Sequence, residues 1–417
     1  MTLFAFVADD FTGATDALWQ FRRFGLSGSL VTDVAHLHDR DDVIGLATTA
    51  RAAADPVATV LPALRAMAAL GPLAVQYKIC STFDSSPEHG SIGAVIAALH
   101  REGPARRAVP VLAAQPEFGR YTWFANHFVR AGDEVVRLDR HPPARDHPVT
   151  PAREADLRVR LTEQGAGRVG WLPAGASEEA YRARAGDAAF VADAMTEDHL
   201  LTLGHLLLTS ASDGDGPLYC VGSGGLSHAL ASALAARHHP ATSARGAGGV
   251  VLGAASPVLV VSGSRSPVTA RQIDAAERAG WTVLDVAGGP ATIAEAEASL
   301  RAGRHTIVQT TRGPARDPAG VGEALGGVAV MAVTKGLVRR LVVAGGDTSG
   351  EVVAALGARA LDVVGTLAVG GPVCVLASDD PACDGLEVAL KGGQVGGEDY
   401  FLRAAAGTGA RSTTNAT

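Results

Sequence analysis

Short apolar runs rich in β-branched residues recur along the first half of the chain and alternate with stretches of a different period. The apolar runs cover residues 3–8, 43–48, 73–79, 109–114 and 218–223. Between them, Ala and Leu recur every three or four residues, as in 56–70 and 91–103, which predicts helices. Strands that are apolar almost throughout and alternate with helices predict a parallel sheet covered on both faces.

A second series of strands and helices follows a break in this pattern. Residues 237–256 are rich in small residues, Gly and Pro and have no clear period, so we place a domain boundary there. Apolar runs return at 257–263, 280–287, 304–311, 339–344 and 372–378. The predicted fold class is α/β with two domains, each a mainly parallel sheet flanked by helices. The expected ranges are 1–240 and 256–405, followed by a frayed tail at 406–417.

Composition and charge narrow the class of protein. The length of 417 residues favours two domains, and 47% of the residues are hydrophobic. The net charge of −7 and the isoelectric point near 6.0 provide no basic field for nucleic acid. The chain does not open on a charged segment followed by a long apolar one, and its apolar runs are far too short to cross a membrane. We therefore expect a cytoplasmic protein that binds neither nucleic acid nor membrane.

Cysteine and histidine spacing gives no sign of a metal site. Cys80, Cys220, Cys374 and Cys383 are scattered without a Cys-x-x-Cys pair. We expect ordinary thiols rather than a disulfide framework or a zinc ribbon. His141 and the other histidines of the Pro-rich stretch around it lack zinc-ligand spacing. The sequence therefore predicts no metal site built from protein ligands alone.

Two adjacent aspartates, Asp9 and Asp10, end the first predicted strand. Thr12 and Gly13 follow, and the apolar positions of 14–21 fit one face of a helix. In open parallel sheets, ligands bind beyond the carboxyl ends of strands. The pair could accept hydrogen bonds from a polyhydroxy ligand, or one carboxylate could act as a general base once its neighbour raises its pKa. The competing interpretation is that one aspartate caps the helix and the other is merely exposed.

A polar stretch at 77–96 is the second candidate on this half of the chain. Lys78 comes off a strand, and Ser81, Thr82 and Asp84 follow it before a glycine-containing turn into a helix. An ammonium group pairs with a carboxylate, and hydroxyls pair with hydroxyls, so the stretch suits an anionic sugar acid. A solvated loop is the alternative.

The junction at Gly345 and Gly346 is the main candidate for an anion site. An apolar strand runs into the two glycines, and Thr348 has the capping-box spacing with Glu351. Free backbone N–H groups and the positive end of a helix dipole would face an anion there, and glycine allows close approach. Asp347 could hold Mg²⁺ through water or take a proton. A tight strand-to-helix turn without a ligand is the alternative.

Two further stretches could serve the same ligand. Ser262, Ser264 and Ser266 follow a strand and could line a phosphate or ribose, although an ordinary N-capping loop explains them equally well. Residues 390–401 place four glycines around Lys391, and a flexible loop with one cation suits a triphosphate. The chain contains no Gly-x-x-x-x-Gly-Lys-Ser/Thr motif, and no Gly-x-Gly-x-x-Gly follows the first strand.

Six stretches, taken in order, resemble the successive motifs of the four-carbon acid sugar kinase family. They read ADDFTGATDA, YKICSTFDSSPEHGSIG, DHPVTP, SGSRSPVTARQI, AGGDTSGEVVAALG and LKGGQVGGEDYF, and the match runs from residue 3 to about 402. The second stretch is similar to the version found in 3-oxo-tetronate kinases rather than to the threonate type. Residues 391–396 read KGGQVG where relatives commonly have Lys-Ser-Gly-Asn-Phe-Gly, so we expect altered nucleotide contacts there.

The resemblance implies an N-terminal sugar-acid-binding domain and a C-terminal nucleotide-binding domain with an active-site cleft between them. It implies that ATP, with Mg²⁺, phosphorylates the terminal hydroxyl of a short 3-oxo sugar acid. Alternative acceptors are 3-oxo-isoapionate, threonate and erythronate. The implied nucleotide contacts are Ser262, Ser264, Gly345, Gly346, Asp347, Thr348, Ser349, Gly350, Lys391 and Gly393. The implied sugar-acid contacts are Asp9, Asp10, Arg51, Lys78, Ser81, Thr82 and Gly93.

Three points stay open at the level of sequence. We expect Asp10, ahead of Asp9, to orient or deprotonate the attacking hydroxyl, with Asp347 as the rival base. An oxidoreductase with a nicotinamide cofactor and a sugar-acid sensor without catalysis are the alternative classes of protein. The Ala-rich helices suggest a possible homodimer.

Overall fold

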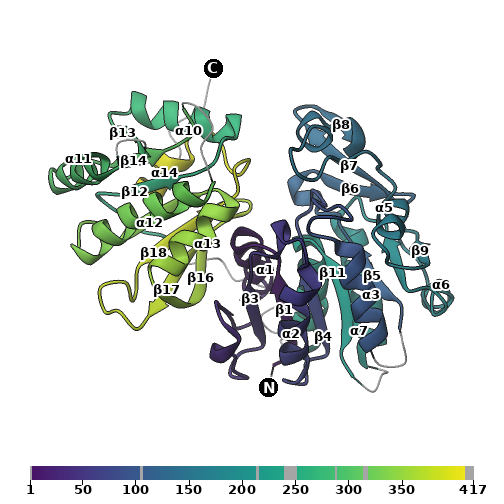
Figure 1. Cartoon of the computed structure of the whole chain (residues 1–417). Helices are drawn as coiled ribbons and strands as arrows, with labels where there is room; N and C mark the ends of the chain where they lie inside the picture. The colour runs from purple at the N-terminus through teal and green to yellow at the C-terminus, as the bar shows by residue number, and fades with distance from the viewer. Residues whose placement is uncertain are drawn as a thin grey trace. The chain divides into compact units, whose positions relative to one another are not determined.

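Two compact units make up the chain, Met1–Gly248 and Gly249–Thr417. The computed structural model describes residues 2–103, 107–212, 216–238, 251–286, 289–312 and 318–408. Each unit has its own run of strands with flanking helices (Figure 1). Most of the predicted boundary segment and of the predicted frayed tail lies outside the described residues. The described chain ends at Thr408, whose N–H donates to the Leu252 carbonyl at 3.0 Å.

The first unit is built on a parallel sheet. Its strands lie in the order β2-β3-β1-β4-β11-β5-β10-β9, and all the neighbours are parallel. The central strands are buried along their whole length, as continuous apolar runs predict. The strands are β1 (Phe4–Ala8), β2 (Gly28–Val31), β3 (Val43–Ala47), β4 (Ala74–Lys78), β5 (Val109–Leu112), β9 (Val169–Leu172), β10 (Ala189–Ala192) and β11 (Leu218–Gly222).

Helices follow most of these strands and pack on one another in two groups. α1 contacts α8, which contacts α7, whereas α2 contacts α3, which contacts α5. The helices of this unit are α1 (Phe11–Arg22), α2 (Pro56–Ala68), α3 (Ile92–Glu102), α4 (Pro142–Arg145), α5 (Leu157–Glu163), α6 (Glu178–Arg182), α7 (Glu197–Ser212) and α8 (Gly224–His238). Its short 3-10 turns are η1 (Val34–His36), η2 (Ala50–Ala52), η4 (Pro116–Phe118) and η5 (Leu138–Arg140).

A small antiparallel sheet interrupts the alternation of strands and helices in the first unit. It consists of β6 (Arg120–Trp123), β7 (Asn126–Ala131) and β8 (Glu134–Arg137), in that order. We did not predict it, because its strands are only partly buried and so lack the continuous apolar runs of the main sheet. The chain enters it directly after β5 and leaves it before α5.

The second unit has a parallel sheet extended by an antiparallel part. The order is β13-β14-β12-β15-β18-β17-β16, and only the pairs β18–β17 and β17–β16 are antiparallel. The strands are β12 (Leu259–Ser262), β13 (Thr282–Asp285), β14 (Thr306–Gln309), β15 (Arg340–Ala344), β16 (Ala358–Ala368), β17 (Gly371–Ser378) and β18 (Glu387–Lys391). The helices are α10 (Pro267–Arg278), α11 (Pro290–Arg301), α12 (Pro318–Thr334), α13 (Gly346–Ala355) and α14 (Tyr400–Ala406).

These two units confirm the predicted fold class of a two-domain α/β protein with mainly parallel sheets. The four cysteines are free thiols, as expected. Among the described helices, none is both long and apolar enough to cross a membrane.

Candidate functional site

Three neighbouring strands of the first unit end at the same edge of its sheet. β1 lies between β3 and β4, and Ala8 is paired with both Ala47 and Lys78. The segments that follow these residues therefore lie together, and this is the edge at which parallel sheets bind ligands. We call Asp9, Asp10, Arg51 and Lys78 the acidic cluster.

Arg51 binds both aspartates of this cluster. Its Nε and Nη2 donate to the Asp9 carboxylate at 3.1 and 2.8 Å, and its Nη1 donates to Asp10 at 2.9 Å. The guanidinium comes from η2, the turn after β3. Asp9 and Asp10 are only 4% and 5% exposed, so their repulsion is not screened by water. One bidentate guanidinium offsets it instead.

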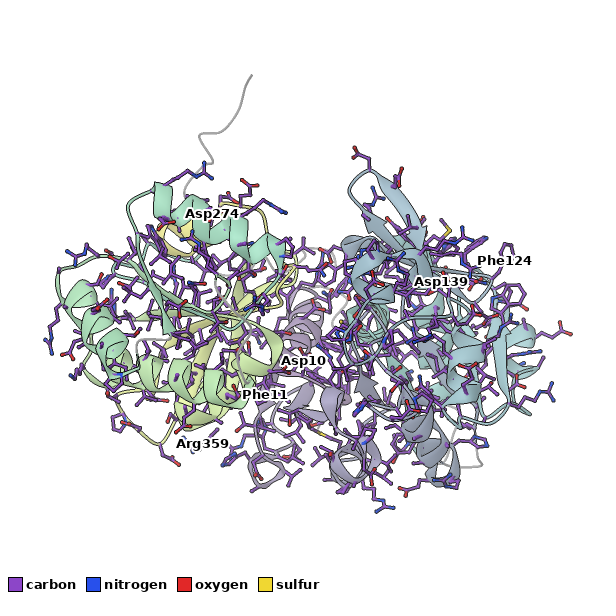
Figure 2. All side chains as sticks on the ribbon, turned by 45° about the horizontal axis from the view of Figure 1, so that its top comes forward. Asp10, Phe11, Phe124, Asp139, Asp274 and Arg359 are labelled. Atoms are coloured by element: carbon purple, nitrogen blue, oxygen red, sulfur yellow. The ribbon has the colours of Figure 1, made fainter. Side chains whose placement is uncertain are left out.

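Asp10 is also the N-cap of α1. Its Oδ1 accepts from the Gly13 N–H at 2.8 Å, and its Oδ2 accepts from the Thr12 hydroxyl at 2.5 Å. Figure 2 labels Asp10 and Phe11, where the helix begins. A Cβ at position 13 would lie 2.4 Å from Asp10 Oδ1, so glycine is required. The capping interpretation is thus confirmed for Asp10, whereas an exposed second aspartate is wrong, because Asp9 is buried.

The two carboxyl groups differ in their affinity for a proton. Burial raises the pKa of Asp9 above its usual value and outweighs the attraction of Arg51. Burial also disfavours ionised Asp10, but Arg51, Lys78 and two hydrogen bonds hold its pKa below the usual value. Asp10 is therefore the firmly ionised member of the pair, and Asp9 is the better proton acceptor.

The side chain of Lys78 faces the other residues of the acidic cluster rather than solvent. The residue is 2% exposed, and its Nζ donates to the Ile79 carbonyl at 3.1 Å. A Cβ at Gly13 would lie 2.9 Å from this Nζ. The positive charge of Lys78 also favours the ionised form of both aspartates, although burial still raises the pKa of Asp9. The amine that we expected to hold a substrate carboxylate is thus already engaged inside the protein.

Buried and half-buried residues alternate along the polar loop after β4 over residues 79–86, so a fully solvated loop does not describe this segment. Ser81 is 7% exposed, and its carbonyl accepts from His127 Nε2 at 2.8 Å. The Thr82 hydroxyl lies 2.6 Å from Asp84 Oδ2. The Thr82 hydroxyl is therefore held by Asp84, and the backbone of Ser81 is held by His127.

Gly93 has a packing role that explains why it is glycine. Its N–H donates to Gln164 Oε1 at 3.0 Å, and a Cβ there would lie 2.5 Å from the Gln164 Cβ. Gln164, directly after α5, therefore accepts from the N–H that was expected to meet the substrate. Gly93 is thus bound to this part of the chain rather than to a residue of the acidic cluster.

Three side chains near the polar loop were not predicted. His127 on β7 is held neutral, because burial lowers its pKa to about 3. Arg160 on α5 donates from Nη2 to the carbonyls of Phe83 and Ser85 at 3.1 and 3.0 Å. Arg120 opens β6 and its charge acts on the same loop. No motif marks these three residues. The available sign was the alternation of polar and apolar residues at 120–123, which is typical of a strand that begins at Arg120.

In the second unit, β12, β15 and β18 also end side by side. Ser262 is paired with Ala344, and Ala344 with Lys391. The serine-containing turn, the double glycine and the glycine-rich loop therefore meet at one edge of the sheet. The structure brings together the three stretches that the sequence singled out for a nucleotide.

α13 begins at Gly346, with Gly345 as its N-cap. Gly345 has φ 127°, a backbone conformation that favours glycine, and its N–H donates to the Lys391 carbonyl at 3.0 Å. The first amides of the helix have no partner within it, so the turn can receive an anion. The predicted capping box is wrong, because Thr348 lies inside the first turn rather than at the N-cap.

We call residues 345–350, at the start of α13, the anion cradle, and hydroxyl groups shape it. Ser349 Oγ donates to the Gly345 carbonyl at 2.7 Å. A Cβ at Gly263 would lie 2.1 Å from Thr348 Oγ1, so the two segments are in close contact. Asp347 is exposed in the first turn of α13. Burial, and after it the charge of Asp347, raises the pKa of Glu351 one turn further on.

The serine-containing turn is both an N-cap and a neighbour of the glycine-rich loop. Ser266 caps α10, as the capping interpretation predicts. Ser264 is 8% exposed and lies 3.1 Å from the Thr269 hydroxyl, and a Cβ at Gly393 would lie 2.6 Å from Ser264 Oγ. Ser262 is fully buried at the end of β12. Backbone and hydroxyl groups therefore line this edge closely, with little room for larger side chains.

Lys391 does not lie in an exposed loop, so that prediction is wrong. It is the last residue of β18 and is fully buried. Its Nζ donates to the Thr269 hydroxyl at 3.2 Å and lies 5.7 and 5.9 Å from the rings of Tyr400 and Phe401. Burial lowers its pKa to about 7.

The glycine-rich loop itself is held by α10. Gln272 Nε2 donates to the carbonyls of residues 395–397 at 2.9, 3.1 and 3.0 Å, and the Thr269 hydroxyl donates to the Gly393 carbonyl at 2.9 Å. A flexible loop was expected here. Its carbonyls are instead fixed by side chains of the neighbouring helix.

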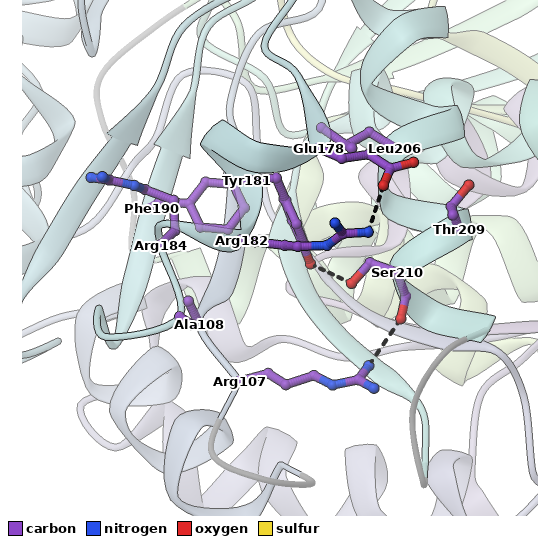
Figure 3. Close-up of a pocket in the computed structure, with 11 residues that line it drawn as sticks. Arg107, Ala108, Glu178, Tyr181, Arg182, Arg184, Phe190, Leu206, Thr209 and Ser210 are labelled. Atoms are coloured by element: carbon purple, nitrogen blue, oxygen red, sulfur yellow. Dashed lines mark hydrogen bonds and ion pairs between the residues drawn. The ribbon is translucent and has the colours of Figure 1, made fainter.

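A cavity of about 250 Å³ in the first unit lies away from these residues (Figure 3). Arg107 and Arg184 on its wall precede β5 and β10, so the cavity opens at the amino edge of the sheet. Arg182 is paired with Glu178, and Arg107 donates to the Ser210 carbonyl. None of the predicted site residues lines this cavity.

Two sequence-family profiles match the chain in order. The profile described as "Sugar-binding N-terminal domain" matches residues 4–230. The profile described as "Nucleotide-binding C-terminal domain" matches residues 259–401. The acidic cluster falls within the first match, and the anion cradle falls within the second.

Named relatives cover nearly the whole chain. A 3-oxo-isoapionate kinase of Paraburkholderia graminis is 36% identical, over 96% of this chain and 93% of its own. A 3-oxo-tetronate kinase of Methylobacterium radiotolerans is 35% identical, over 95% of this chain and 97% of its own. The fold is similar to that of a solved Salmonella typhimurium protein, at 26% identity with a TM-score of 0.76 over 97% of this chain and 98% of that one.

Replacing Arg51 should make stability fall more steeply as pH rises through the titration of the acidic cluster. In Arg51→Met, the folded-state pKa of Asp9, already raised, should rise further, and that of Asp10 should move from below to above its unfolded value, because both buried carboxylates lose their guanidinium. Stability should then be present at low pH and lost as pH rises through those pKa values. We expect a loss of about 3 kcal/mol at pH 8 and a smaller loss at pH 5, measured by urea unfolding.

Arg65→Met is the matched control, because Arg65 pairs with Glu102 at the surface. This variant should unfold like the unmodified protein at both pH values. An Arg51 variant that is equally destabilised at pH 5 and pH 8 would contradict the proposed charge balance.

Lys391 should make the protein more stable as pH rises from about 7 to 10. Its folded pKa lies below the unfolded value, so the unfolded chain binds an extra proton in this window, worth up to about 1.4 kcal/mol per pH unit. Lys391→Met should remove this slope in unfolding experiments. Lys335→Met, which breaks only a surface pair with Glu297, should keep it. An unchanged slope in Lys391→Met would rule out a depressed pKa.

Proposed function

The chain belongs to the four-carbon acid sugar kinase family, and we propose that it transfers the γ-phosphoryl group of ATP to a hydroxyl of a short 3-oxo sugar acid. The observation that carries the proposal is the buried acidic cluster at the ligand-binding edge of the unit that matches the sugar-binding profile. The anion cradle lies at the corresponding edge of the unit that matches the nucleotide-binding profile.

Asp9 is our candidate for the group that contacts the attacking hydroxyl. Asp10 receives hydrogen bonds from Thr12, Gly13 and Arg51, so its lone pairs are largely used. Among the residues that the structure describes, only Arg51 donates side-chain hydrogen bonds to Asp9. Its raised pKa also makes it the better acceptor for the hydroxyl proton. This reverses the order that we expected from the sequence and gives Asp10 a positioning role.

On the nucleotide side, we propose that the first-turn amides of α13 and the segments around Ser264 and Gly393 hold the phosphates. The residues proposed there are Ser262, Ser264, Gly345, Gly346, Asp347, Thr348, Ser349, Gly350 and Gly393. Lys391 contributes through its backbone carbonyl, which holds Gly345. Phosphoryl transfer relies mainly on such positioning and charge stabilisation, because the protein forms no covalent bond to the phosphate.

The residues present are compatible with Mg²⁺ bound together with ATP. The described residues include no group of three or more His, Cys, Asp or Glu that could hold a metal. Mg²⁺ at kinase sites needs only one or two carboxylates, with phosphate oxygens and waters completing its shell. Asp347 is exposed at the cradle and could supply that carboxylate. The bound ion would offset part of the phosphate charge.

The acceptor should be a 3-oxo sugar acid of four or five carbons. The two named relatives act on 3-oxo-tetronate and 3-oxo-isoapionate by their names, and these acids share a carboxylate, a 3-oxo group and hydroxyls. Threonate and erythronate lack the oxo group and are the second choice.

A coupled assay of ADP release across these four acids tests the function. We expect ATP-dependent turnover with at least one 3-oxo acid. Absence of turnover with every acid, combined with thermal stabilisation by NAD but not by ATP, would favour an oxidoreductase. Absence of turnover with stabilisation by a sugar acid alone would favour a sensor.

Substitution of the two aspartates tests the choice of base. Asp9→Asn should lower kcat by about 10²–10⁴-fold, because an amide cannot take the hydroxyl proton. Asp10→Asn should lower kcat less, since asparagine still caps α1 and accepts from Gly13. Circular dichroism should show both variants folded. A larger loss in Asp10→Asn would assign the hydroxyl contact to Asp10.

A further inference from the structure

The edge of the first unit carries more cations than the acidic cluster uses. Arg120 from β6 and Arg160 from α5 both act electrostatically on Asp84, in the loop that follows Lys78. Neither arginine forms an ion pair with a carboxylate within the described part of the chain. Arg160 is 6% exposed, and its Nη1 has no hydrogen-bond partner. Unpaired buried cations are costly unless an anion joins them.

Three of the cations at this edge already have a structural task. Arg51 is bound to both aspartates, and Lys78 is enclosed beside them. Arg160 uses Nη2 to hold the polar loop through two carbonyls, and its guanidinium lies 5.4 Å from the centre of the Phe83 ring. This loop includes Phe83, which has φ 57°. Arg160 therefore serves as a positioning residue for the loop.

Arg120 differs in that, within the described part of the chain, the hydrogen bonds of its guanidinium stay within its own turn. Nη1 donates to the carbonyls of Phe118 at 2.9 Å and Gly119 at 3.5 Å, and its buried Nε has no hydrogen-bond partner among the residues that the structure describes. Its backbone is fixed, because it exchanges two hydrogen bonds with Gln115, just beyond the end of β5. The side chain is thus anchored at the carboxyl edge of the sheet with a donor left over.

The rest of the small sheet is attached to the same loop. His127 on β7 donates to the Ser81 carbonyl at 2.8 Å. The charge on Arg120 also acts on Cys80, and so does that of Arg51. Cys80 thus lies within electrostatic reach of both the acidic cluster and Arg120. The burial of Arg120, which lowers its pKa, shows that water screens its charge only in part.

We propose that Arg120 binds the carboxylate of the sugar acid. The proposal deepens the proposed function and rests on it. A guanidinium presents a planar pair of donors that matches a carboxylate, and such charge-assisted bonds discriminate strongly when they are partly desolvated. Recognition of the acid group thus comes from the small sheet, whereas the hydroxyls are recognised by Asp9 and its neighbours.

The test compares a sugar acid with the uncharged ketose of the same carbon skeleton, in which a CH₂OH group replaces the carboxylate. Arg120→Met should raise the KM for the acid by at least about tenfold. It should leave kcat/KM for the ketose within about twofold, so that the preference for the acid collapses. Arg120→Lys should restore part of the preference, because it keeps the charge without the planar fork.

Arg130→Met is the matched control. Arg130 lies on the same small sheet, is exposed, and donates to the Tyr121 hydroxyl. Its loss should leave the KM values for the acid and for ATP unchanged. Circular dichroism should establish that the Arg120 variants are folded.

Two results would overturn the proposal. One is an equal fall in kcat/KM for the acid and the ketose in Arg120→Met, which would show a structural role. The other is an unchanged KM for the acid. If the unmodified protein phosphorylates no acid, the proposed kinase function fails, and calorimetric titration of the same acids without ATP decides the role of Arg120. Binding that is lost in Arg120→Met supports it, and binding that persists, or no binding at all, refutes it.

Discussion

Neutralisation of Asp9 and Asp10 by Arg51 is the interaction on which the first unit's site depends. Two adjacent carboxylates with almost no exposure to water cannot both stay ionised without a nearby cation. This cation, Arg51, lies in a turn some 40 residues later in the chain. It reaches the two aspartates only when β1 and β3 pair in the observed register. The sheet and the charge balance therefore support each other, and a slip of register would leave two buried charges unpaired.

The predicted ligand of the second unit is strongly negative, but few cationic side chains of the described residues lie at the proposed nucleotide site. Lys391 is turned inward against Tyr400 and Phe401, and it holds Thr269 rather than facing solvent. On the proposed assignment, the positive potential comes instead from backbone amides at the start of α13. Amides placed by a strand end need no side-chain ordering when a ligand binds, so little entropy is lost.

The two-domain α/β organisation could be predicted because buried parallel strands leave continuous apolar runs in the sequence. The acidic pair and the double glycine were also visible, since each directly follows such a run. The partners were not: Arg51 and Asp9 are 42 residues apart, and nothing local distinguishes Arg51 from the other arginines. β6–β8 are partly exposed, and their alternation of polar and apolar residues is too weak to predict strands. Arg120 and His127, which lie on these strands, were therefore not predicted either. Lys391 was misplaced because the glycines that follow it indicate a loop, whereas the apolar residues before it extend strand β18 up to Lys391 itself.

On the proposed assignments, acceptor recognition is divided between two parts of the chain that are fixed in different ways. Asp9 is held by the pairing of fully buried parallel strands, whereas Arg120 is held by a small, partly exposed antiparallel sheet attached through Gln115 and His127. The separation of these two groups sets the length of acid that can place a carboxylate on one and a hydroxyl on the other. Changes in the small sheet can therefore alter this length without disturbing the acidic cluster. Acceptor choice among similar acids should then follow the geometry of β6–β8 more closely than that of the central sheet.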